Sequence, residues 1–177
     1  MSIYKLKNGQ EVILREADKG DAKELIDFYN FVGGETDFLS FGKNEFKVTL
    51  EYEEGYLEKL RKEENSILIL AVIEGRIIGG ASINSDQKRR HKHVGTLGIV
   101  IKKEFCGMGL GRLLIEYLIE WAKSNGITKK ITLITRCDNY KAIELYKKLG
   151  FETEGVLKNE NYESGKYYDC LTMGILL

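Results

Sequence analysis

Residues 97–114 read LGIVIKKEFCGMGLGRLL: an aliphatic run, then three glycines at alternate positions, then a new apolar repeat. The aliphatic run predicts a strand, and the apolar repeat has helical spacing up to the stop signal Asn125-Gly126. Gly107, Gly109 and Gly111 let the backbone turn sharply and approach a ligand closely. Because a helix start offers unpaired N–H groups and a positive dipole end, this segment predicts a phosphate or diphosphate site.

Two common phosphate-binding fingerprints are absent from the sequence. After Gly107 and Gly109, Arg112 stands where the dinucleotide fingerprint G-x-G-x-x-G needs its third glycine. No G-x-x-x-x-G-K-[ST] occurs either, which excludes a Walker loop. Taken alone, the glycine run is also compatible with a tight strand-to-helix turn that binds nothing.

The other segments predict an α/β (α+β) sandwich with a mixed sheet flanked by helices, in the order β-α-α-β-β-β-α-β-α-β-β. Strands are expected at residues 12–14, 67–73, 76–83, 94–101, 130–135, 153–162 and 166–176. Helices are expected after Asp18 or Asp21, at about 49–64, after the glycines, and at 139–149. Residues 32–47 read as a mobile loop. With 177 residues and no visible linker, the chain is expected to form one domain.

Composition narrows the classes of function. The 27 basic residues balance 27 acidic ones, so nothing favours nucleic acid or an anionic membrane as partner. The longest apolar runs, such as 67–73, are too short to cross a bilayer, and the N-terminus lacks the core of a signal peptide, so a cytoplasmic location is expected. Three cysteines without a C-x-x-C pair, and His91 and His93 without further ligands at suitable spacing, predict no disulfide framework and no metal site.

Two motifs resemble those of the GNAT superfamily of N-acetyltransferases. Residues 99–111 resemble its acyl-CoA-binding motif, an aliphatic strand followed by [QR]-x-x-G-x-[GA], with Cys106 where Gln or Arg is usual. Residues 138–151, DNYKAIELYKKLGF, resemble its N-x-x-A-x-x-x-Y-x-x-x-G-F signature. The likeness covers nearly the whole chain and is greatest to the branch of ribosomal-protein, diamine and antibiotic-type enzymes. It implies a mostly antiparallel central sheet, the GNAT-like acyl-CoA N-acyltransferase fold, and a single N-acetyltransferase domain over 1–177.

The resemblance also implies that the chain binds acetyl-CoA. In the family, a splayed strand pairs with the pantetheine arm, a role that carries over to Ile99, Val100 and Ile101. The diphosphate would lie on the backbone of Cys106, Gly107, Met108, Gly109, Leu110, Gly111 and Arg112, with charge added by the Arg112 side chain or with that side chain in solvent. The thiol of Cys106 is expected either to have a lowered pKa beside the helix start or to be a small neutral filler.

The same resemblance assigns catalytic roles. Asn139 would bind the cofactor or cap its helix, and Tyr146, about two helical turns further, would protonate the departing thiolate or be a core aromatic. Candidate bases are Glu35 and Asp37 in the loop after the first helix, which are otherwise ordinary solvent-facing acids. Thr96 stands where some relatives carry Glu, which favours a water-mediated route.

The expected function is therefore acetyl-CoA-dependent transfer of an acetyl group to a primary amine of a small molecule or peptide, by direct attack on the thioester. The alternatives are a ribosomal-protein-type N-terminal acetyltransferase and a non-catalytic acetyl-CoA-binding sensor. The expected partner is the amine substrate, with no nucleic acid and no membrane, and a homodimer is common among similar proteins. The identity of the amine cannot be read from these residues.

Overall fold

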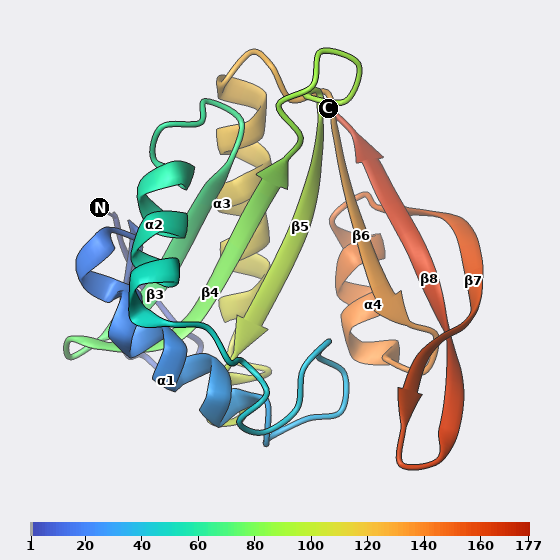
Figure 1. Cartoon of the computed structure of the whole chain (residues 1–177), viewed down its shortest axis with the longest axis horizontal. Coiled ribbons are helices and arrows are strands. Elements are labelled where there is room, and N and C mark those ends of the chain that lie inside the picture. The colour runs from blue at the N-terminus through green and yellow to red at the C-terminus, as the bar shows by residue number, and fades with distance from the viewer. Residues whose placement is uncertain (1) are drawn as a thin grey trace.

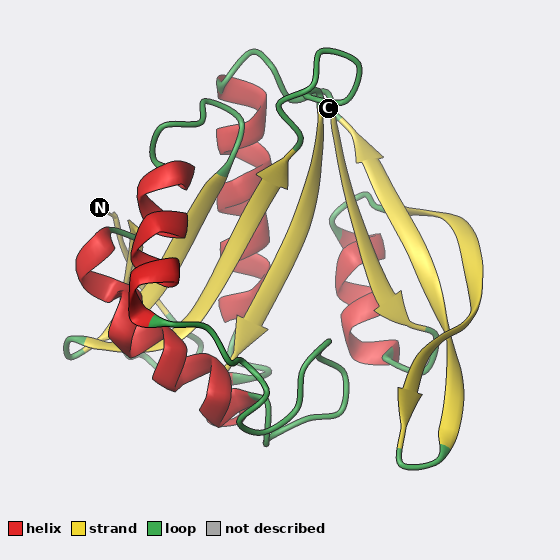
Figure 2. Ribbon diagram, viewed as in Figure 1, coloured by secondary structure: helices red, strands yellow, loops and turns green. Residues whose placement is uncertain are grey.

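The computed structural model describes residues 2–177, which form an eight-stranded sheet with helices on both faces (Figures 1 and 2). The strands are β1 (Ser2–Lys5), β2 (Glu11–Glu16), β3 (Ile67–Ile73), β4 (Arg76–Ser85), β5 (Val94–Ile101), β6 (Lys130–Arg136), β7 (Glu152–Glu163) and β8 (Lys166–Leu176). The helices are α1 (Ala22–Val32), α2 (Leu50–Leu60), α3 (Leu110–Ser124) and α4 (Tyr140–Lys148). The sheet order is β1-β2-β3-β4-β5-β6-β8-β7, and within residues 2–177 only β5 and β6 pair in parallel. The predicted mixed, mostly antiparallel sheet is confirmed.

The sheet has a separate apolar core on each face. Helices α1 and α2 cover one face, and α3 and α4 cover the other (Figure 1). In β3, Leu68 and Leu70 pack with α1 and α2, whereas Ile69 and Ala71 pack with α3. Because both faces of this central strand are buried, it reads as a continuous apolar run rather than as an alternation.

The predicted element order holds, with one addition. Strand β1, which pairs antiparallel with β2, lies outside the predicted strands because four residues are too few to show a period. Glu74 and Gly75 form the predicted hairpin turn with φ of 49° and 77°, the left-handed pair that a tight two-residue turn requires.

The sheet opens between β5 and β6. These strands pair only over Val94–Thr96 and Lys130–Thr132, and then they separate toward the end where α3 begins (Figure 1). Each remains bonded on its outer side, β5 to β4 as far as Ile101 and β6 to β8 as far as Arg136. The facing edges therefore carry backbone N–H and C=O groups that have no partner strand among the described residues.

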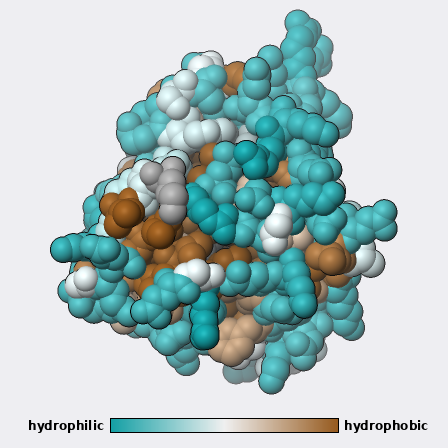
Figure 3. Space-filling view, turned by 90° about the vertical axis from the view of Figure 1, so that its left-hand side faces the viewer, coloured by the Kyte–Doolittle hydropathy of each residue, from teal (hydrophilic) through white to brown (hydrophobic). Residues whose placement is uncertain are grey.

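The side of the molecule that carries the N-terminus is largely hydrophilic, with one main apolar patch and smaller apolar groups elsewhere on the same face (Figure 3). A patch of this kind is ordinary on a folded protein, whose surface is more than half apolar. Among residues 2–177, no helix is both long and apolar enough to span a membrane.

Candidate active site

The glycine loop lies at the open end of the β5–β6 gap and presents a run of free backbone donors. Gly107 and Gly109 have φ of 78° and 92°, a conformation that L side chains rarely adopt. The first helical bond of α3 is made by the N–H of Leu113 to the carbonyl of Gly109, at 3.1 Å. Within residues 2–177, no hydrogen bond from the N–H groups of residues 107–112 to an acceptor is formed. Together with the helix dipole, these groups favour an anion.

Gly111 serves packing between elements. A Cβ at this position would lie 3.3 Å from the side chain of Leu145 and 3.5 Å from that of Ile101. Its absence lets α3 pack closely against both α4 and β5. The α-carbon of Gly111 therefore faces protein, and only its N–H belongs to the run of free donors.

The charges around Cys106 differ from the predicted pattern. Burial, with a smaller contribution from Glu35, raises the pKa of the Cys106 thiol, whereas Lys141 and Lys103 act in the opposite direction. Of the two alternatives for Cys106, the lowered pKa is contradicted because desolvation of the thiolate outweighs the nearby positive charges, and the raised pKa agrees with a small neutral filler. The two lysines nevertheless place positive charge beside the glycine loop.

Two predicted cofactor contacts have protein partners of their own. The guanidinium of Arg112 lies 3.2 Å from the carboxylate of Glu116 on the exposed side of α3. Asn139 stands at the N-cap position of α4 but makes no side-chain cap, and its Nδ2 donates to Oγ1 of Thr135 at 3.3 Å. Thr135 is the penultimate residue of β6, so Asn139 ties the start of α4 to the strand that borders the gap.

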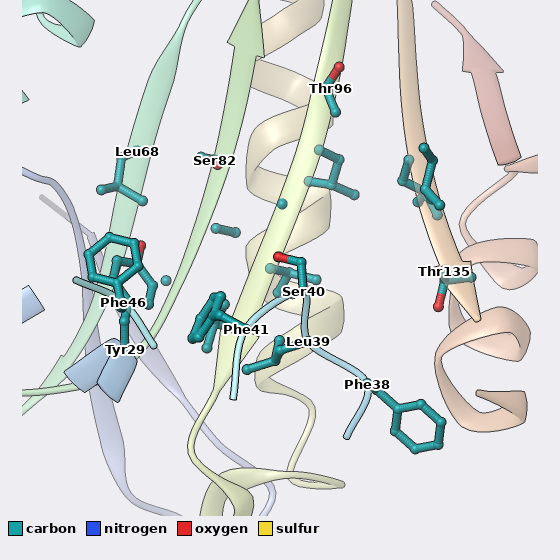
Figure 4. A pocket seen from close by; sticks show the side chains of 18 of the residues that line it. Tyr29, Phe38, Leu39, Ser40, Phe41, Phe46, Leu68, Ser82, Thr96 and Thr135 are labelled. Atoms are coloured by element: carbon teal, nitrogen blue, oxygen red, sulfur yellow. The ribbon is translucent and has the colours of Figure 1, made fainter. Parts of the chain in front are cut away.

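A cavity of about 780 Å³ occupies the space between the β5–β6 gap, α2 and the loop over residues 38–48 (Figure 4). Figure 4 shows Thr96 and Thr135 on the facing strands at one side, with Tyr29 and Phe46 at the other. The sequence-predicted residues that line it are Thr96, Ile99, Val100, Asn139 and Tyr146. The structure thus brings the two predicted motifs together on one cavity.

Tyr146 joins this cavity from α4, on the opposite face of the sheet from α2. Its side chain is 7% exposed, and its ring packs against Phe151 with 5.9 Å between centroids. Burial raises the pKa of Tyr146 to about 12, because the phenolate would lose its hydration there. At this pKa the hydroxyl keeps its proton at neutral pH. In the described part of the chain, the hydroxyl has no hydrogen-bond donor or acceptor as partner.

The two predicted bases do not line the cavity. Glu35 accepts the backbone N–H of Lys103 at 2.9 Å, so its carboxylate secures the turn that follows β5. The Asp37 side chain is exposed, and its backbone carbonyl accepts from Arg136 at 3.2 Å.

Arg136 is a site residue that sequence reasoning missed. Its guanidinium is 6% exposed and makes a two-pronged bond to Asp138, at 3.0 and 2.6 Å. It also donates to the carbonyl of Asp37 and lies over the rings of Tyr168 and Phe38, at 3.6 and 5.0 Å from their centroids. One side chain therefore joins the end of β6 to β8 and to the loop that closes the cavity.

Glu53 is a second missed residue. It lines the cavity from α2, is 2% exposed, and burial raises the pKa of its carboxyl group. The signal was present in the sequence: Glu53 precedes Leu57 and Leu60 by four and seven residues, so it occupies the buried stripe of an amphipathic helix. A carboxylate in such a stripe needs a specific reason to be there.

The arrangement has a definite chemical capacity. Free N–H groups at the start of α3 suit a diphosphate, and the open edge of β5 suits an extended chain bearing amide groups. Tyr146 supplies a protonated hydroxyl, and the cavity on the α2 side supplies a carboxylate. Within residues 2–177, no group of three or more His, Cys, Asp or Glu side chains is placed to hold a metal ion.

Comparison with known proteins points in the same direction. The model of the acetyltransferase (GNAT) family matches residues 35–151. The L-amino acid N-acetyltransferase AaaT of Escherichia coli is 29% identical over 130 residues, which are 73% of this chain and 80% of that protein.

Solved structures agree with the fold. An acetyltransferase of the GNAT family from Streptococcus pneumoniae superposes with a TM-score of 0.91 at 41% identity, over 94% of this chain and 99% of that one. A Salmonella typhimurium protein, solved with its cofactor acetyl-CoA, has a TM-score of 0.80 at 21% identity, over 93% of each chain. The second likeness concerns the fold alone.

Proposed function

This chain belongs to the acetyltransferase (GNAT) family and is an N-acetyltransferase, and we propose that it transfers the acetyl group of acetyl-CoA directly to a primary amine of a small molecule or peptide. The observation that carries the proposal is the β5–β6 gap, which leads from the free N–H groups of residues 107–112 to the cavity lined by Tyr146. The site fits the cofactor: free donors suit its diphosphate, and the unpaired strand edge suits the amides of its pantetheine arm.

Bound acetyl-CoA supplies the thioester whose carbonyl carbon the amine attacks. The residues of the chain then have separate tasks. The N–H groups of 107–112 hold the diphosphate, with Lys103 and Lys141 contributing positive charge. The edge of Ile99, Val100 and Ile101 aligns the arm, and a backbone N–H there stabilises negative charge on the acyl oxygen. Tyr146 gives its proton to the departing sulfur.

The base stays a prediction. An alkyl ammonium has a pKa near ~10 and must lose a proton before it attacks. Glu35→Gln and Asp37→Asn are expected to raise the apparent KM for the amine, and unchanged kinetics in both variants would dismiss this loop. Thr96, a hydroxyl at the point where the gap opens, supports a route through water.

We further propose that residues 1–177 act as one N-acetyltransferase domain in the cytoplasm. A homodimer stays a prediction, which the mass measured by light scattering tests directly.

Calorimetry with acetyl-CoA, followed by thiol release in the presence of candidate amines, tests the function. We expect saturable binding, a rise in melting temperature, and thiol release that depends on the amine. The absence of both heat and stabilisation with saturating acetyl-CoA or coenzyme A would overturn the proposal.

A further inference from the structure

Glu53 is a buried acid without a protein counter-charge. Of the other buried charged side chains in residues 2–177, Asp21 pairs with Arg15 and Arg136 pairs with Asp138. The carboxylate of Glu53 has neither an ion pair nor a hydrogen bond among the described residues, although it lines the cavity. The carboxylate faces the cavity with little contact to solvent, so a cationic ligand at this point would offset the cost of its desolvation.

Aromatic rings surround the same part of the cavity. Tyr29, Phe41 and Phe46 form a cluster with ring centroids 4.7 to 5.9 Å apart (Figure 4). Tyr56 of α2 also lines the cavity. Burial is the main cause of the raised pKa of both Tyr29 and Tyr56, and the charge of Glu53 raises both further, which places it close to them. Aromatic faces attract cations, so rings and carboxylate favour the same ligand.

The cavity lacks a counterpart for a substrate carboxylate. Its charged lining residues are Glu53, Glu160 and Arg136. Arg136 already binds Asp138 in two-pronged fashion, donates to a backbone carbonyl and lies over two rings. The described lining therefore disfavours an acceptor that carries a free carboxylate, such as an α-amino acid.

Glu53 is set back from the place of transfer. The cavity crosses three strands, since Leu68, Ser82 and Gly98 lie side by side on β3, β4 and β5 and all line it. At about 4.8 Å per strand this row is roughly 10 Å long. Helix α2 packs on β3, at the far end of the row from the gap, and Tyr146 enters from the other face of the sheet. A cation at Glu53 is therefore a different group from the amine that reacts.

We propose that Glu53 binds the second ammonium group of a linear aliphatic diamine or polyamine, while the first amine reaches the β5–β6 gap. This inference rests on the proposed function and names its substrate class. Rings of Tyr29, Phe41 and Phe46 cover the methylene chain, and Glu53 fixes the distal charge.

Three probes with the same carbon chain test it: 1,5-diaminopentane, 1-aminopentane and L-lysine, which is the diamine with a carboxylate added. The wild type is expected to show a kcat/KM at least about tenfold higher for the diamine than for the monoamine. A factor of about ten or more is what one charge-assisted hydrogen bond between Glu53 and the second ammonium group would contribute. L-lysine is expected to be a poorer substrate than the diamine. Equal values for the diamine and the monoamine, or a preference for L-lysine, would overturn the inference without recourse to any variant.

Variants of α2 add a second test. Glu53→Gln is expected to abolish most of the preference for the diamine, measured as the ratio of kcat/KM for the diamine to kcat/KM for the monoamine. Glu51→Gln is the matched control, because Glu51 lies in the same first turn of α2 but is exposed. A Glu53→Gln variant that keeps the full preference contradicts the inference.

Calorimetry on the protein saturated with coenzyme A separates this inference from the proposed function. If the diamine binds to the wild type and not to Glu53→Gln, yet no amine is acetylated, the ammonium site stands and acetyl transfer fails. If monoamines are acetylated and the diamine binds no better than they do, acetyl transfer stands and the ammonium site fails.

Discussion

Thr96 of β5 and Thr132 of β6 form the last pair of the parallel ladder between these strands. From the next residue onward, each strand is bonded only on its outer side, to β4 or to β8. A gap in the middle of a sheet leaves two rows of backbone groups without partners, which is costly unless water or a ligand meets them. The candidate active site therefore lies where the hydrogen-bonded ladder of the eight-stranded sheet is interrupted, between β5 and β6.

Gly109 links the shape of the loop to cofactor binding. Gly109→Ala and the control Gly126→Ala both put a side chain at positive φ, 92° and 73° respectively, so each should cost roughly 1–2 kcal/mol in urea unfolding. Only Gly109→Ala should also raise the KM for acetyl-CoA. The backbone at residue 109 would shift to relieve the strain of the new side chain, and this shift would reorient the N–H groups of residues 107–112. An equal KM in the two variants would argue against binding at this loop.

Tyr146→Phe should lower kcat by about a hundredfold or more while coenzyme A still binds, since the general acid is lost. Tyr140→Phe is the control, because Tyr140 lies on the same helix at 72% exposure. Burial raises the folded-state pKa of Tyr146 to about 12, above the ordinary ~10. Its contribution to stability is thus complete below pH ~10 and is lost as the pH rises through the folded value. Full turnover in Tyr146→Phe would rule out the acid role, and no turnover even in the wild type would favour a sensor.

Arg136→Lys should loosen the cavity loop at Asp37 and Phe38, the two residues that Arg136 contacts there. Lysine cannot reproduce the two-pronged bond to Asp138 or the stacking on Tyr168. We expect a loss of about 1–3 kcal/mol in stability and faster amide exchange in that loop, read by mass spectrometry. Arg90→Lys, an exposed change in the turn after β4, should alter neither. Unchanged exchange in Arg136→Lys would mean that the loop is held by other contacts.

Glu53→Gln should make the ligand-free protein more stable at pH 8. Burial raises the folded-state pKa of Glu53, so stability is complete below the unfolded value and falls as the pH rises through the folded one. Glutamine does not ionise, so the variant does not lose stability in this way. Its advantage over the wild type should disappear near pH 4, where the side chain at position 53 is neutral in both folded proteins. Melting temperatures at the two pH values measure the effect, and a variant less stable than the wild type at pH 8 would refute it.

The sequence alone was enough to predict the features that depend on residues close together in the chain. The β3 and β4 runs, the turn at Glu74-Gly75 and the glycine loop before α3 follow from local period and backbone preference, and all are confirmed. The two motifs at residues 99–111 and 138–151 also identified the family, because their order and spacing are rarely matched by chance.

Only the tertiary structure decided which side chains meet in the cavity. Glu35 and Asp37 were chosen by their place in a loop, yet Glu35 bonds to the backbone after β5 and Asp37 is exposed. Glu53 and Arg136, far apart in the sequence, line one cavity. The reason is physical: the partner of a buried charge and the cavity that it faces depend on packing across the sheet, which no local period records.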